Sequence, residues 1–112
     1  MATSNPKPEY GEMLYSGAAN RKMQGEYTGG HLYLYRDTLY YKSHGMNIQV
    51  NEVAIPLGSI REVGFFRTLG LVPNGLEIFL ANGGIEHFVV NHRKDWKQHI
   101  AEAILSLNRR TL

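Results

Sequence analysis

The sequence contains no cysteine, so disulfide bonds and thiolate metal sites are excluded. No stretch approaches the roughly 18 apolar residues that a membrane-spanning helix needs. The opening residues, MATSNPKPEY, also lack the apolar segment of a signal peptide. These absences predict a cytoplasmic protein, because a chain without cysteine fits a reducing compartment. At 112 residues, one domain with a single hydrophobic core is expected.

A strong excess of either charge is also missing. Twelve Lys and Arg residues face ten Asp and Glu residues, for a net charge of +2. A nucleic-acid binder usually gathers its basic residues into a stripe. Here only Arg36 and Lys42 lie near the tyrosine-rich stretch Gly29 to Gly45, so we predict no nucleic-acid partner. The tyrosines of this stretch are expected to divide between the core and cross-strand pairs on the outer face of a sheet.

Motifs for catalysis are absent too. The sequence has no Gly-x-Ser-x-Gly, no His-Glu-x-x-His and no phosphate-binding loop. Among the five histidines, His92 and His99 are seven residues apart, about 10 Å along a helix, which is too far to share a metal ion. The other histidines show no paired spacing. We therefore predict no enzyme activity, no metal site and no cofactor.

Alternation of apolar and polar residues indicates β-strands. Leu32 and Leu34 alternate with aromatic residues, and Asn82-Gly83 between two apolar runs is a strong hairpin signal. Pro56 indicates an edge strand or a strand end, because proline cannot donate to a ladder. Residues 20–27 are polar and are interpreted as a connection. The expected strands lie near residues 13–19, 31–35, 39–42, 53–57, 60–65, 76–80 and 85–90.

The last part of the chain changes to a helical period. Trp96, Ile100, Ala103, Ile104 and Leu107 form one apolar stripe on a helix. We expect Asn91 as its N-cap and Asn108 as its end.

A lone helix with one apolar stripe must cover an open surface of the sheet. The prediction is a mainly β fold, with about seven strands in two orthogonal antiparallel sheets or a partly open barrel, capped by the C-terminal α-helix. The domain is expected at residues 13–108, after a flexible lead-in at 1–12 and before a tail at 109–112. The expected core contains Leu32, Leu34, Leu39, Ile60, Val63, Ile78, Phe88, Trp96, Ile100 and Ile104.

Four ordered blocks of the sequence resemble the GRAM branch of the pleckstrin-homology-like superfamily. Gly30-His31-Leu32-Tyr33-Leu34-Tyr35, followed by Leu39, Tyr41 and Ser43, is similar to the family's first block. The family usually has threonine at Tyr35 and phenylalanine at Tyr41. Residues 55–63, 74–78, and 88–90 with 93–96 resemble the later blocks, so the resemblance covers roughly residues 13–107. It implies a barrel that works as a non-catalytic binding module.

Two kinds of partner are consistent with such a module. The first is a protein or a second copy of the chain, contacted through sheet edges and exposed apolar side chains. The candidates are Leu69, Leu71 and Val72 in a loop, and Leu105 and Leu107 near the helix end. The loop has two alternatives: it could dip into a bilayer, or it could fold back over the mouth of the barrel, as apolar loops of this kind more often do.

The second kind of partner is an anionic lipid headgroup, which would place the protein peripherally at a membrane. The resemblance implies that basic loops at the open end of the barrel bind phosphoinositides, and the matching residues here are Arg21, Lys22, Lys42 and His44. The family's phosphoinositide signature is incomplete, because Thr38 stands where a basic residue is usual. The sequence therefore slightly favours the protein partner.

Overall fold

The structure is a computed structural model that describes residues 4–45 and 51–110. Short connections join the strands and helices along most of this length. The elements in chain order are η1 (Pro8–Tyr10), β1 (Met13–Met23), β2 (Glu26–Tyr35), β3 (Thr38–Ser43), β4 (Glu52–Pro56), η2 (Leu57–Ser59), β5 (Ile60–Thr68), β6 (Val72–Leu80), β7 (Ile85–Val90) and α1 (Arg93–Arg110). Every predicted strand is present, and α1 is the predicted C-terminal helix.

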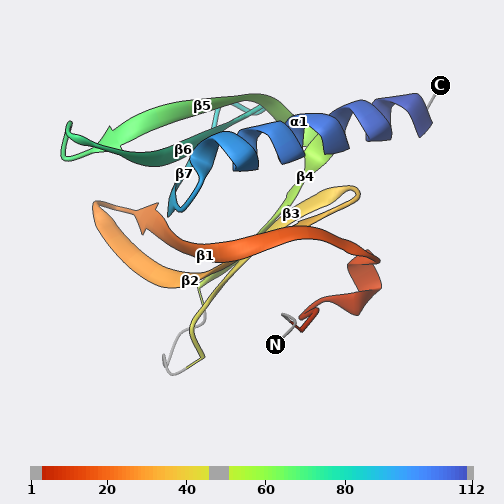
Figure 1. The fold of residues 1–112 in the computed structure, drawn as a ribbon, viewed down its shortest axis with the longest axis horizontal. Coiled ribbons are helices and arrows are strands. Elements are labelled where there is room, and N and C mark those ends of the chain that lie inside the picture. The colour runs from red at the N-terminus through yellow and green to blue at the C-terminus, as the bar shows by residue number, and fades with distance from the viewer. Residues whose placement is uncertain (1–3, 46–50, 111–112) are drawn as a thin grey trace.

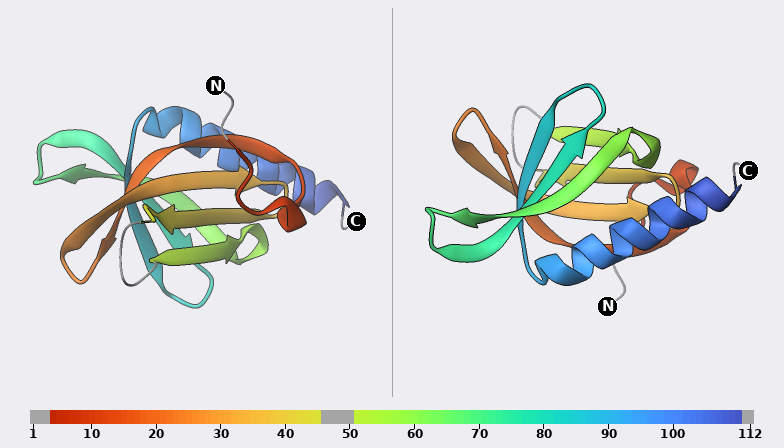
Figure 2. Two further views of the ribbon diagram at one scale, coloured as in Figure 1. Left: turned by 90° about the horizontal axis from the view of Figure 1, so that it is seen from below. Right: turned by 90° about the horizontal axis from the view of Figure 1, so that it is seen from above.

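The seven strands form one antiparallel sheet in the order β4-β3-β2-β1-β7-β6-β5. The sheet curls, so that β1–β4 and β5–β7 form two walls of a partly open barrel, and α1 lies across the opening (Figures 1 and 2). The long strand β1 joins the walls, because it pairs with β2 and also with β7. The predicted fold class is confirmed, and Pro56 lies in the edge strand β4 as expected.

The predicted connection at residues 20–27 is wrong. β1 continues to Met23, and β2 begins at Glu26 after a two-residue turn. Gln24 and Gly25 both have positive φ, 51° and 81°, as a tight hairpin turn with a right-handed strand twist requires. The backbone pairing continues through Arg21 and Thr28, although the side chains there are polar.

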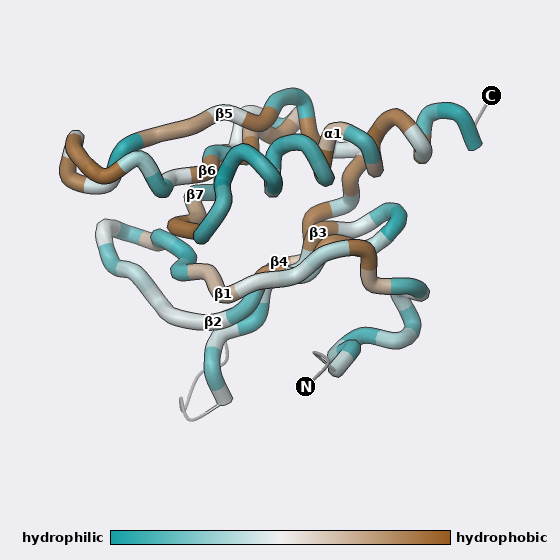
Figure 3. Tube along the Cα trace, viewed as in Figure 1, coloured by the Kyte–Doolittle hydropathy of each residue, from teal (hydrophilic) through white to brown (hydrophobic). Residues whose placement is uncertain are grey.

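The helix differs from its prediction only at its ends. It spans Arg93–Arg110, and the His92 carbonyl accepts a hydrogen bond from the Trp96 N–H at 3.1 Å. His92 therefore occupies the N-cap position predicted for Asn91, and the helix continues two residues beyond Asn108. In Figure 3 the first turns of α1 are teal, and brown segments appear further along the helix before its teal end.

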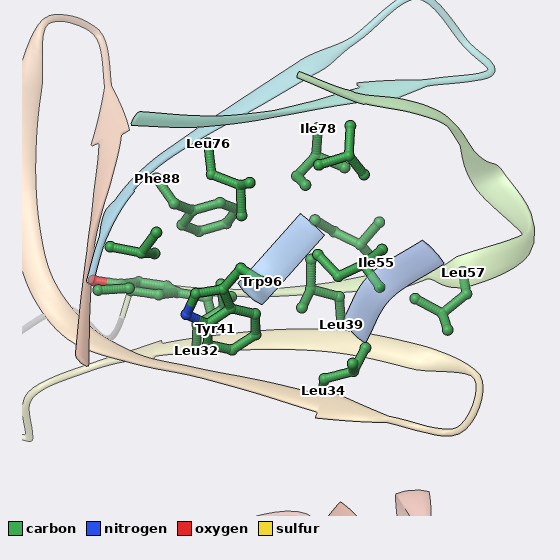
Figure 4. Close-up of a cluster of buried hydrophobic side chains, with 14 of the residues drawn as sticks. Leu32, Leu34, Leu39, Tyr41, Ile55, Leu57, Leu76, Ile78, Phe88 and Trp96 are labelled. Atoms are coloured by element: carbon green, nitrogen blue, oxygen red, sulfur yellow. The ribbon is translucent and has the colours of Figure 1, made fainter. Parts of the chain in front are cut away.

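The core fills the space between the two walls and the helix. Trp96 is 1% exposed, and its ring packs against the Tyr15 ring in a T-shaped arrangement at a centroid distance of 4.6 Å. Figure 4 shows Trp96 among side chains from both walls, including Leu32 and Phe88. The predicted core residues are buried, except that Ile60 and Ile104 are half-buried and pack against the core.

The tyrosines divide between the two faces of the sheet, as predicted. Tyr41 lies in the core, while Tyr33 and Tyr40 stack across β2 and β3 with ring centroids 6.1 Å apart. Tyr10, from the segment before β1, contacts Tyr35 at 5.4 Å and Tyr40 at 6.0 Å. The residues that precede β1 thus cover part of the outer face.

Burial of phenols makes the fold sensitive to alkali. Burial raises the pKa of Tyr35, Tyr40 and Tyr41 above the ordinary value of 10.0, and the Glu52 carboxylate that accepts from Tyr40 raises that residue's pKa further. The unfolded chain therefore releases these protons at lower pH than the folded chain does. The stabilisation is complete below about pH 10 and is lost as the pH rises above it.

We expect the free energy of unfolding, measured by urea denaturation, to fall between about pH 9.5 and pH 11. Tyr41→Phe should reduce that slope, because it removes one buried phenol. A free energy of unfolding that stays constant across this range would contradict the expectation, as would a slope that Tyr41→Phe leaves unchanged.

Candidate functional site

The mouth of the barrel contains a buried ion pair. Arg21 on β1 points inward and is 8% exposed. Its guanidinium donates from Nε and Nη2 to the two carboxylate oxygens of Glu86 on β7, at 2.9 Å each. Nη1 donates to Asn51 Oδ1 at 2.6 Å. Two parallel charge-assisted bonds of this kind fix both position and orientation.

Other hydrogen bonds extend this network across the mouth. The Asn51 N–H donates to Ser43 Oγ at 3.0 Å, and the Tyr41 hydroxyl donates to the Thr28 carbonyl. Within the described part of the chain, every buried side-chain nitrogen and oxygen atom has a hydrogen-bond partner. The polar groups inside the mouth are therefore engaged with one another.

The four predicted anion ligands do not converge. Arg21 points into the barrel and is bonded to Glu86, whereas Lys22 is exposed on the opposite face of β1, 5.8 Å from the centre of the Tyr27 ring. Lys42 on β3 and His44 directly after it are exposed on either side of the buried Ser43, so both lie on the outer side of the sheet. Arg21 and Lys22 both line an open hollow of about 320 Å³ beside the β1–β2 turn, but Lys42 and His44 are not among its lining residues.

The hairpin of β5 and β6 projects from the body as a finger, defined here as residues 66–74 (Figure 1). Its tip carries the predicted apolar contact residues, with Leu69 91%, Leu71 76% and Val72 46% exposed. The brown tip of the finger stands clear of the barrel in Figure 3. The alternative, in which this loop folds back over the barrel mouth, is therefore not what the structure shows.

Basic side chains gather where the finger meets the helix. Arg93 donates from Nη1 to the Phe66 carbonyl at 2.9 Å, and its guanidinium lies 4.5 Å from the centre of the Phe65 ring. Arg67 and Lys94 are exposed beside it. We call Arg67, Arg93 and Lys94 the basic collar. With Pro73, His92 and Asp95 they line an open hollow of about 580 Å³.

An apolar groove of about 440 Å³ runs between β5 and α1. It is lined by Ile60, Arg61, Glu62, Val63, Lys97, Ala101, Ile104 and Leu105. Among the described strands β5 pairs only with β6, so its other edge is free and adjoins this groove. Leu105 is 55% exposed at the groove, whereas the other predicted helix residue, Leu107, packs against the core.

Neither a metal centre nor a membrane-spanning helix is evident in residues 4–45 and 51–110. No three His, Asp or Glu side chains in these ranges lie close enough to hold a metal ion. No helix in the same ranges is both long and apolar enough to cross a bilayer.

Sequence reasoning did not identify the basic collar, the β5–α1 groove or the partners of Arg21. The collar and the groove each combine residues from β5 or its hairpin with residues from α1. The sequence predicts the strand and the helix that carry these residues, but it does not show that α1 lies beside β5. The collar and the groove exist only because α1 packs there.

Comparisons with known proteins identify the fold and nothing finer. Neither a protein-family model nor a curated protein sequence matches the chain. The C-terminal domain of an unknown protein from Leishmania infantum is similar in structure, with a TM-score of 0.75 and 13% identity over 88% of this chain and 91% of that one. The N-terminal PH domain of human ARAP2 matches with a TM-score of 0.64 and 18% identity, over 83% of this chain and 80% of that one.

The linker-DH/PH fragment of p115-RhoGEF matches with a TM-score of 0.65 and 13% identity over 93% of this chain. This chain corresponds to 34% of that fragment. The strand order, the C-terminal helix and these structural neighbours together show that the chain has a pleckstrin-homology-like fold.

Proposed function

We propose that the chain is a non-catalytic, GRAM-type binding module that binds an extended segment of a protein partner along the free edge of β5. The observation that carries this proposal is the coincidence of that edge with the apolar groove beside α1. An edge strand presents unpaired N–H and C=O groups, to which another chain can add as a strand.

The groove can bind side chains of the added strand. An added strand directs alternate side chains to opposite faces, so one set would point toward α1. Ala101 leaves room there, and Ile104 and Leu105 offer apolar contact. An aliphatic or aromatic side chain seated in the groove would lose its contact with water, which favours binding.

The charges around the groove favour a neutral or acidic segment. Arg61 and Lys97 are both exposed at its rim, against the single acidic residue Glu62. Charge complementarity of this kind raises the association rate and disfavours basic partners.

One structural neighbour was solved while bound to another protein, which is consistent with protein binding by this chain. The DH/PH domains of PDZ-RhoGEF were solved in a complex with activated RhoA. That likeness, at 14% identity, is one of fold alone. A second copy of the chain is the other protein that this edge fits, since two β5 edges could pair antiparallel about a two-fold axis.

Selection from a displayed library of random peptides tests the proposal. We expect enriched peptides to bind the wild-type chain, and Ala101→Arg to weaken that binding at least about tenfold, because the longer side chain fills the groove. Ala81→Arg, at an exposed alanine in the β6–β7 turn, is the matched control and should bind as the wild type. Failure to enrich any peptide, or full binding by Ala101→Arg in a monomeric chain, would overturn the proposal.

Weak binding of anionic lipid headgroups by Lys22, Lys42 and His44 is a second candidate. The exposure of all three side chains on one face of the sheet favours it. The engagement of Arg21 by Glu86 counts against a headgroup pocket inside the mouth. In either form we propose a cytoplasmic module, peripheral to the membrane in the second.

A further inference from the structure

The tip of the finger holds a leucine in an unfavourable backbone conformation. The Leu71 N–H donates to the Thr68 carbonyl at 3.0 Å, which closes a turn with Leu69 and Gly70 at its centre. Both central residues have positive φ, 54° and 72°. Glycine and asparagine adopt this conformation readily, but a leucine there is strained by contact between its Cβ and the backbone.

The backbone of the turn does not call for leucine. The β1–β2 turn also has positive φ at both central residues, Gln24 and Gly25, and it carries a polar side chain at the first position. Leu69 is 91% exposed, so packing within the described chain does not compensate for its strain. A strained, exposed apolar residue is explained by a contact outside the chain.

The residues around the tip indicate what kind of surface Leu69 contacts outside the chain. Leu69 and Leu71 stand at the end of a narrow projection, while the basic collar of Arg67, Arg93 and Lys94 lies at its base. Asp95 is the one acidic residue lining the same hollow. An apolar tip with cations set behind it matches the two layers of a membrane surface, where anionic headgroups lie above the acyl chains.

We infer that the finger inserts its tip into the surface of a membrane that contains anionic lipids. Leu69 and Leu71 enter the acyl layer, and the collar contacts lipid phosphates. Binding of this kind depends on the negative charge of the membrane surface and on insertion of apolar side chains into the acyl layer. It needs no pocket for a lipid headgroup. It uses residues outside the β5–α1 groove, so either site can fail without the other.

Co-sedimentation with vesicles tests this inference, using phosphatidylcholine alone or mixed with about 30% phosphatidylglycerol. We expect the wild-type chain to bind only the mixed vesicles, and less strongly at high salt. Leu69→Asn should weaken binding about tenfold, because one apolar side chain no longer enters the bilayer. Arg67→Glu with Lys94→Glu should weaken it at least as much.

The melting temperature separates a binding role from a folding role. Asparagine relieves the strain, so Leu69→Asn should melt roughly 4 °C higher than the wild type while binding worse. Gln24→Asn is the matched control at the other turn, and it should also melt higher while binding normally. Together these results would show that Leu69 promotes membrane binding and lowers the melting temperature of the chain.

Four results would overturn the inference. Wild-type chain that stays in solution with mixed vesicles would indicate that the finger contacts a protein. Normal vesicle binding by Leu69→Asn would show that the tip does not insert. A lower melting temperature for that variant would show that Leu69 supports the fold. Loss of binding only in Lys22→Glu with Lys42→Glu would move the membrane contact to the outer face of β1 and β3.

Discussion

Replacing Trp96 by alanine is expected to lower the free energy of unfolding by about 3–5 kcal/mol. The indole is 1% exposed, makes a T-shaped contact with Tyr15 and lies between both walls of the barrel (Figure 4). Its removal leaves a cavity at the place where α1 closes the fold. Urea denaturation followed by far-UV circular dichroism measures the loss, because the variant has no tryptophan to report by fluorescence.

Leu105→Ala is the control on the same helix. Leu105 is 55% exposed, so its truncation should cost less than about 1 kcal/mol. A loss of less than about 1 kcal/mol for Trp96→Ala as well would mean that the helix does not cover the core as described.

Arg21→Met is expected to lower the free energy of unfolding by about 3 kcal/mol at neutral pH. The substitution leaves the Glu86 carboxylate in the barrel mouth without its two hydrogen bonds from the guanidinium. The Arg21 and Glu86 side chains are 10% and 18% exposed, so solvent only partly compensates the stranded charge. The same denaturation measurement applies.

The double variant Arg21→Met with Glu86→Leu distinguishes the loss of the ion pair from the cost of leaving one buried charge unpaired. Because it removes both charges, it should recover most of the stability that Arg21→Met loses. The cycle also needs Glu86→Leu alone. If the losses of Arg21→Met and Glu86→Leu simply add in the double variant, Arg21 and Glu86 are not coupled. That result would mean that the mouth is open, and Arg21 would again be available to an external anion.

The strands and the helix were predictable because their apolar side chains repeat at the period of each element. Leu32, Leu34 and the stripe through Trp96 are clear examples. The pattern failed at residues 20–27 because the inward position in β1 holds Arg21, whose charge interrupts the alternation. The turn sequence Gln24-Gly25 is also a weaker hairpin signal than the Asn82-Gly83 that marks the β6–β7 turn.

The candidate site was less predictable because its contacts join distant parts of the chain. Arg21 was interpreted as an anion ligand, and its partner Glu86 lies 65 residues away on a strand that meets β1 only in the folded sheet. One signal was present: Glu86 alternates with Phe88 and Val90, which places it on the inward face of β7. Recognising the pair also required knowing that the first strand lies beside the last.

The finger was partly predictable. Leu69, Leu71 and Val72 were identified as contact residues from their apolar character in a loop. The sequence could not show that the loop projects, because its direction depends on the pairing of β5 with β6. Nor could it show the basic collar, since Arg93 and Lys94 reach the finger only through the start of α1.

Backbone amide shift mapping of the isotope-labelled chain, during titration with a selected peptide, tests the central proposal most directly. Binding at the free edge of β5 should move amide signals in residues 60–65 and 97–105, and should protect β5 amides from exchange with solvent. Shifts confined to residues 21–24 and 42–45, with β5 and α1 unchanged, would place recognition at the barrel mouth and contradict it.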